Sequence, residues 1–185
     1  MSPSKQNPDL DPLISLVHHR WSIPIIALLY CRSGAKFITL ANQLGASRTS
    51  MNVSLRHLIA LGLVERNTGH GHPMRPEYLL TRRGMAIGRH CVVLNQAVRQ
   101  KDDADLAFRK WTLPLVAAIG EDSLRFNELR SVLADATPRA ITLGLKSLLR
   151  ERWANRTLID EYPPAAGYQL LSKGQRVLSC MNGLY

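Results

Sequence analysis

The chain carries the same pattern twice, at an offset of 90 residues. The segment Arg-Trp-Ser-Ile-Pro-Ile around Trp21 returns as Lys-Trp-Thr-Leu-Pro-Leu around Trp111. The offset also relates pairs of apolar, aromatic, proline and glycine residues farther along: Leu55 and Leu145, Leu58 and Leu148, Pro73 and Pro163, Tyr78 and Tyr168, Gly84 and Gly174. A unit of this length is too long for a solenoid repeat and long enough for a domain. The sequence therefore predicts two copies of one fold, with domains at 1–98 and 99–185.

The composition is that of a globular chain. Of its 185 residues, 45% are hydrophobic and 21% are charged, which excludes a disordered polymer. The polar start has no signal-peptide pattern, and the longest apolar run, Ile23 to Leu29, is too short to span a bilayer. We expect a cytoplasmic, nucleoid-associated protein with no membrane partner.

The charge balance points to a polyanionic partner. The net charge is +10, and residues 1–95 hold 11 basic and 4 acidic residues, a net of +7. A basic excess of this size most often serves nucleic-acid binding, although solubility alone is the alternative. The three cysteines form no Cys-x-x-Cys pair, so we expect buried thiols rather than a disulfide framework or a zinc site.

Periodicity and turn residues predict the same elements in each unit. Apolar spacing and N-cap candidates indicate four helices, a hairpin and a last helix. In unit one we expect a helix from Asp9 to Arg20, a helix Ile23 to Tyr30 capped by Ser22, a short helix capped by Thr39, strands Leu63 to Arg66 and Pro76 to Leu80, and a long helix that begins at its cap Thr81 and ends at Lys101. Between the short helix and the strands we expect a long helix capped by Ser47, with an apolar face of Met51, Leu55, Leu58 and Ile59. Thr137 is expected to cap its counterpart in unit two. Gln100 to Asp105 is expected to be a polar joint.

A short helix, a tight turn and a longer helix make a helix-turn-helix, whose second helix can enter a DNA major groove. Arginine there can read guanine, and asparagine can read adenine, by paired hydrogen bonds. The alternative is an ordinary solvated face of an amphipathic helix. The candidate DNA contacts on the first such helix are Ser47, Arg48, Thr49, Asn52 and Arg56.

The hairpin of unit one carries a cationic tip. His70, His72 and Arg75 lie in a glycine-rich turn that could follow phosphates or a minor groove. No acidic residue stands at ligand spacing to the two histidines, so we predict no metal, no cofactor and no enzyme activity.

Unit two repeats the helix with different chemistry. Its candidate DNA contacts are Thr137, Arg139, Thr142 and Lys146. Its hairpin tip holds Asp160 and Glu161, whose carboxylates would repel phosphates. We therefore expect unit one to be the stronger reader of DNA.

The motifs of both units resemble the HxlR-type bacterial transcription regulators, relatives of the MarR group. The family's Gly-Lys-Trp-Thr stretch is met by Arg20-Trp21-Ser22 and by Lys110-Trp111-Thr112, and its Phe-x-Glu-Leu by Phe126-Asn127-Glu128-Leu129. Its Gly-Leu-Val-x-Arg is met by Gly62 to Arg66, and its Glu-Tyr-x-Leu-Thr-x-x-Gly by Glu77 to Gly84. Unit two departs from the family with Arg152-Trp153-Ala154 in place of Gly-Leu-Val, and the chain lacks the cysteine that many members carry before the first helix.

The resemblance implies a mainly α fold with small β-hairpin wings: two tandem winged-helix domains joined by a long helix. It also implies a regulator that binds double-stranded DNA. Members usually hold one domain and pair as homodimers through terminal helices, whereas this chain could act alone as a covalent pseudo-dimer. If the helix Thr81 to Lys101 packs on the helix Ser172 to Cys180, the two reading helices could reach successive major grooves about 34–36 Å apart, on an asymmetric site.

Two questions stay open at the level of sequence. A tandem winged-helix, chromosome-associated scaffold without base readout is the alternative to a regulator. A pocket for an unknown small-molecule effector could involve Trp21, Ile25, Cys91 and Leu94, but an ordinary core is the simpler interpretation of these residues.

Overall fold

The computed structural model describes residues 9–67, 77–98, 100–159 and 165–185. Two units follow one another with the same order of elements, as the repeat predicts. Unit one contains α1 (Asp11–Leu16), α2 (Ser22–Arg32), β1 (Ala35–Lys36), α3 (Phe37–Leu44), α4 (Arg48–Ala60), β2 (Val64–Asn67), β3 (Glu77–Leu80) and α5 (Arg82–Ala97). Unit two contains α6 (Lys101–Ala107), α7 (Thr112–Ile119), β4 (Leu124–Arg125), α8 (Phe126–Val132), α9 (Pro138–Arg150), β5 (Ala154–Ile159), β6 (Ala165–Leu170) and α10 (Ser172–Cys180).

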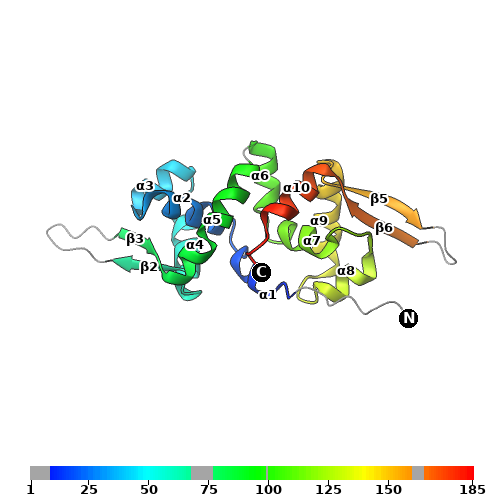
Figure 1. Cartoon of the computed structure of the whole chain (residues 1–185), viewed down its shortest axis with the longest axis horizontal. Coiled ribbons are helices and arrows are strands. Elements are labelled where there is room, and N and C mark those ends of the chain that lie inside the picture. Colours follow the sequence, from blue (N-terminus) through cyan, green and yellow to red (C-terminus); the bar gives the residue numbers. More distant parts are fainter. Residues whose placement is uncertain (1–8, 68–76, 99, 160–164) are drawn as a thin grey trace.

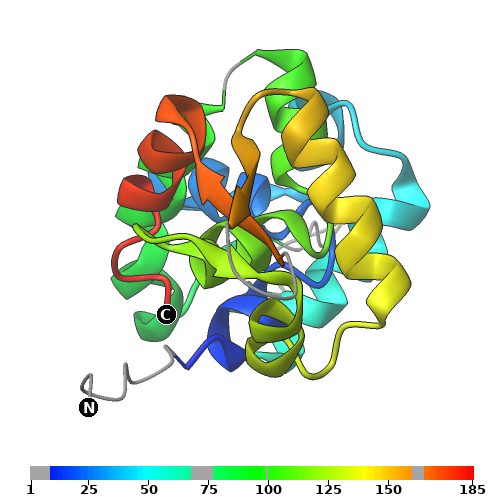
Figure 2. The same ribbon diagram turned by 90° about the vertical axis from the view of Figure 1, so that its right-hand side faces the viewer.

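The molecule is elongated, with the hairpins at its two ends (Figure 1). Helices α1, α5, α6 and α10 fill the middle, and α5 packs against α10 as anticipated. Seen from the end of unit two, the strands β5 and β6 lie between α10 and α9 (Figure 2). The buried side chains of both units join in one hydrophobic core, in which all eight residues of α7 are buried. No helix in the described ranges is long and apolar enough to cross a bilayer.

Each hairpin gains a third strand that the sequence pattern does not predict. The sheets have the orders β1-β3-β2 and β4-β6-β5, and all pairs are antiparallel. In unit one, Ala35 pairs with Tyr78 at one edge and Arg66 pairs with Tyr78 at the other. A strand of two residues has no alternation to detect, so neither β1 nor β4 could be found by pattern.

Three of the predicted N-caps are confirmed. The side chains of Ser47, Thr81 and Thr137 each accept a hydrogen bond, at 3.2 Å, from the backbone N–H three residues on. Two other predicted caps are wrong. Thr39 lies inside α3, which begins at Phe37, and Ser22 is the first residue of α2, buried, with no partner for its hydroxyl among the described residues.

Both ends of the first unit differ from prediction. Helix α1 is shorter than expected, because turns bonded from His18 N–H to the carbonyl of Ser15 and from Ser22 N–H to that of His19 bend the chain into α2. Helix α5 ends at Ala97 rather than at Lys101. The expected polar joint is instead helix α6, whose first turn carries two aspartates that favour the positive helix end.

Close backbone packing explains the recurring glycine of each last helix. A Cβ on Gly84 would lie 2.0 Å from the carbonyl oxygen of Leu63, and one on Gly174 would lie 2.3 Å from that of Trp153. Gly62 has φ +67° in the turn before β2, and Arg152 takes the same left-handed conformation at φ 57° in unit two. The two turns are therefore alike although one has lost its glycine.

Only one of the three cysteines is a buried thiol, although all three were expected to be buried. Cys91 is fully buried on α5, and this burial raises the pKa of its thiol to about 12. Cys31 is exposed near the end of α2, and Cys180 is half-buried. Ile25, Cys91 and Leu94 are fully buried core residues, which agrees with the ordinary-core interpretation of the suggested pocket.

Candidate nucleic-acid interface

Helix α4 separates a buried face from a polar one. Met51, Leu55 and Leu58 are at most 2% exposed and anchor the helix in the core, whereas Ile59, which the spacing placed on the same face, is 38% exposed because it lies at the edge of that face. Arg48, Asn52 and Arg56 recur every four residues and therefore lie on one stripe. All five predicted contacts of this helix are exposed: Ser47, Arg48, Thr49, Asn52 and Arg56.

Helix α9 shows the same division with fewer free polar groups. Thr137, Arg139, Thr142 and Lys146 are all exposed. The Thr142 hydroxyl donates to the carbonyl of Pro138 at 2.8 Å, and the Thr137 hydroxyl is occupied as the N-cap. Leu143 is 54% exposed beside them, so this surface is more apolar than that of α4.

The predicted wing contacts His70, His72 and Arg75 lie outside the described residues, as do Asp160 and Glu161. The described bases of the two wings are different in length and chemistry. Strands β2 and β3 have four residues each, whereas β5 and β6 have six. In β5 the side chain of Leu158 is 81% exposed.

A cationic corner, formed by a basic residue beside a tryptophan, adjoins each of these helices and is absent from the predicted contacts. Arg20 lies 5.4 Å from the ring centre of Trp21, and Lys110 lies 5.1 Å from that of Trp111. Each corner borders a groove against α4 or α9, of about 290 Å³ in unit one and about 260 Å³ in unit two. A basic residue directly before tryptophan in both repeats was the available signal.

Three histidines gather at the corner of unit one. The rings of His18, His19 and His57 have centres 4.7 to 5.6 Å apart, and His57 Nε2 lies 2.7 Å from the carbonyl oxygen of Ser15. Burial, then Lys110 and His57, lower the pKa of His18. Burial, then His57, His18 and Lys110, lower that of His19. Unit two therefore brings a positive charge against a histidine cluster of unit one.

This cluster predicts a loss of stability on mild acidification. The unfolded chain protonates His18 and His19 near the ordinary pKa of 6.5, while the folded chain protonates these two residues only at lower pH. The unfolded state then binds more protons, so the free energy of unfolding falls as the pH drops below about 6.5 and through the lowered folded pKa. Lys110→Gln should weaken this dependence. Urea unfolding of both proteins between about pH 7.5 and about pH 5 measures it, and a stability that rises on acidification would contradict the prediction.

A helix-turn-helix followed by a hairpin, with a third short strand closing the sheet, defines the class of winged helix-turn-helix proteins. The family model of the HxlR-like helix-turn-helix matches this chain twice, at residues 16–104 and 106–185. The chain belongs to this HxlR-like family. It is a tandem member of a group of DNA-binding transcription regulators.

Solved structures with similar chains include three regulators. A MarR-family regulator from Porphyromonas gingivalis W83 is 24% identical, with TM-score 0.40, over 42% of this chain and 76% of that one. The reduced form of the transcriptional regulator YodB from B. subtilis is 18% identical, with TM-score 0.43, over 45% and 82%. A MarR-family regulator from Enterococcus faecalis V583 is 22% identical, with TM-score 0.38, over 49% and 74%.

Proposed function

We propose that the protein is a bacterial transcription regulator that binds double-stranded DNA as a covalent pseudo-dimer, with the domains 1–98 and 99–185 each supplying one reading helix. The observation that carries this proposal is the exposed stripe of Arg48, Asn52 and Arg56 on a helix anchored by its opposite face. Guanidinium and amide groups on one such stripe suit paired hydrogen bonds to guanine and adenine in a major groove.

Unit one is proposed as the stronger reader. Its helix α4 presents two arginines and an asparagine, whereas the α9 hydroxyls of Thr137 and Thr142 are already occupied within the helix. The exposed Leu143 offers no donor to a base and suits only apolar contact, such as with a thymine methyl group. The predicted DNA site is therefore asymmetric, because the two helices differ.

Contacts between the units support the pseudo-dimer. Helix α5 packs on α10, α1 packs on α7, and Arg20 forms an ion pair with Asp105. In a homodimer the terminal helices hold two chains together. Here these contacts and the shared core would hold the two units of one chain together. Light scattering of the DNA complex separates the two assemblies, since a pseudo-dimer has one chain per site.

The test of the reading role is a binding-site selection from random duplex with the wild type and Arg48→Ala. The variant should relax base preference at one position by about 1–3 kcal/mol. Arg139→Ala should have a smaller effect, and Arg89→Ala, which removes an exposed arginine of α5, is the charge-matched control. An unchanged preference after Arg48→Ala would overturn the role of α4. Equal affinity of the wild type for selected and random duplex would favour a scaffold over a regulator.

A further inference from the structure

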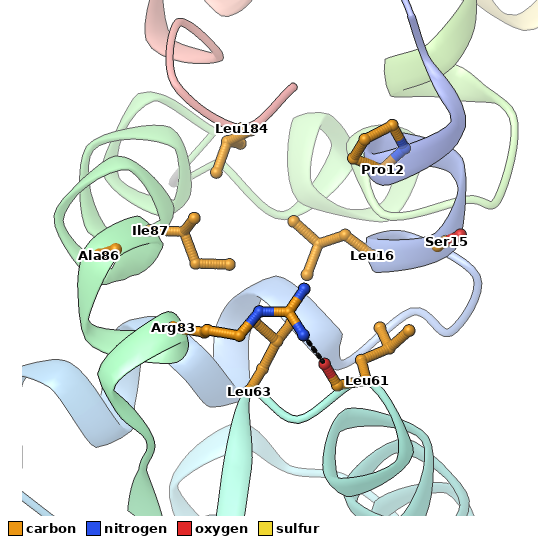
Figure 3. A pocket seen from close by; sticks show the side chains of 9 residues that line it. All are labelled: Pro12, Ser15, Leu16, Leu61, Leu63, Arg83, Ala86, Ile87 and Leu184. Carbon is orange, nitrogen blue, oxygen red and sulfur yellow. Dashed lines mark hydrogen bonds between the residues drawn. The ribbon is translucent and has the colours of Figure 1, made fainter.

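Unit one contains a cavity of about 480 Å³ near the base of its wing. It lies between α1, the turn from α4 to β2, α5 and the end of the chain (Figure 3). Apolar side chains from four separate segments face it: Leu16, Leu63, Ile87 and Leu184. Its volume is in the range of sites for small organic molecules.

One charged group borders this apolar space. Arg83 is an exposed residue of α5 whose guanidinium lies beside the lining side chains, and its Nη1 donates to the carbonyl oxygen of Leu61 at 3.3 Å (Figure 3). That bond is long and uses one of five guanidinium N–H groups. In the part of the chain that the structure describes, Arg83 has no carboxylate partner.

In unit two, side chains fill the position that corresponds to the cavity of unit one. At the offset of 90 residues, Lys173 stands for Arg83, and Trp153 stands for Leu63. The Lys173 ammonium donates to both carboxylate oxygens of Asp103, at 3.0 and 3.3 Å. The Trp153 indole N–H donates to the same carboxylate at 3.1 Å, and the indole is 1% exposed.

The equivalence of the two places is structural as well as sequential. Thr81 N–H bonds to the carbonyl of Leu63 at 3.1 Å, and Leu171 N–H bonds to that of Trp153 at 2.9 Å. Unit two thus carries its own carboxylate and its own aromatic ring beside the cation. Unit one has Leu13 where unit two has Asp103, and the smaller Leu63 where unit two has tryptophan. Unit one therefore retains a cation, Arg83, but lacks the carboxylate and the aromatic ring that accompany Lys173 in unit two.

We propose that the cavity of unit one binds a small carboxylate with an aromatic or branched apolar body. Its carboxylate would accept charge-assisted hydrogen bonds from Arg83, as the Asp103 carboxylate accepts them from Lys173 in unit two. The apolar body would occupy the space that the Trp153 ring fills in unit two, against Leu16, Ile87 and Leu184. Such a ligand touches the residues that join α4 to the wing, so an effect on DNA affinity would follow. That effect rests on the proposed function, whereas binding itself does not.

Calorimetric titration of the full chain without DNA tests the site. The probes are indole-3-acetate, phenylacetate and hexanoate, each compared with its neutral amide. We expect at least one acid to bind with a dissociation constant below about 1 mM, and its amide to bind at least tenfold more weakly. Arg83→Met should weaken the acid at least tenfold, while Arg82→Met, a change of the adjacent exposed arginine on the same helix, should leave it unchanged.

A second variant keeps the test decisive if Arg83→Met does not fold. Leu63→Trp introduces the ring of unit two and should block the acid. The proposal is overturned if no acid binds the wild type up to about 10 mM, or if the acids bind Arg83→Met or Leu63→Trp as well as they bind the wild type. Because DNA is absent, a failure to bind DNA leaves this outcome unaffected. A bound acid that leaves DNA affinity unchanged would overturn only the regulatory part.

Discussion

Trp153→Ala is expected to lower the free energy of unfolding by about 3–5 kcal/mol, as for other buried tryptophans cut to alanine. Trp153 is among the largest fully buried side chains and is 1% exposed. The substitution leaves a cavity between β5, α10 and α6, and it also removes the indole N–H that Asp103 accepts at 3.1 Å. Asp103 is only 8% exposed, so a lost partner there is costly.

Urea unfolding at neutral pH measures this loss, with Trp153→Phe as the matched control. Phenylalanine keeps most of the ring volume and lacks only the hydrogen-bond donor, so its loss should be clearly smaller. A similar loss for both variants would assign the effect to the hydrogen bond with Asp103 rather than to packing. A loss below about 1 kcal/mol for Trp153→Ala would contradict the burial of this residue.

The affinity for duplex DNA should fall steeply as salt is added. The basic residues that we propose at the DNA interface near α4 and α9 include Arg48, Arg56, Lys110, Arg139 and Lys146. If about six phosphates are neutralised, the affinity should drop about 10³-fold between 50 and 200 mM salt, because bound counterions are released from the DNA. Fluorescence anisotropy at several salt concentrations gives the slope directly.

Removing one phosphate contact should change the slope of log affinity against log salt concentration by about one. Lys110→Ala, which removes a cation of the corner beside α9 that we propose as a phosphate contact, should reduce the slope by about one, while Arg89→Ala on α5 should not change it. An affinity that is nearly independent of salt would contradict an electrostatic interface, whatever its strength.

Internal repetition made much of the fold predictable. Met51, Leu55 and Leu58 predicted the buried face of α4, and Ser47, Thr81 and Thr137 predicted three caps that the hydrogen bonds confirm. The repeat could also have predicted α6, because residues 101–107 lie at the offset of 90 from α1. The two aspartates at 102 and 103 instead suggested a polar joint.

Features that depend on tertiary contact were beyond the sequence. The cavity of unit one exists because Leu184, at the far end of the chain, returns to lie beside Leu16 and Ile87. The filled counterpart depends on Asp103, whose partners Trp153 and Lys173 are 50 and 70 residues away. No local pattern joins such residues, although the comparison of the two repeats could have marked Leu63 against Trp153. The wing contacts His70, His72 and Arg75 remain predictions.

Titration of the 185-residue chain against its selected duplex at low ionic strength tests whether one chain reads one DNA site through α4. We expect saturation at one chain per duplex. Joint substitution of Arg48 and Asn52 by alanine should make binding much weaker while circular dichroism shows an unchanged fold. A chain that binds no duplex under these conditions, or that binds equally well without these two side chains, would contradict this expectation.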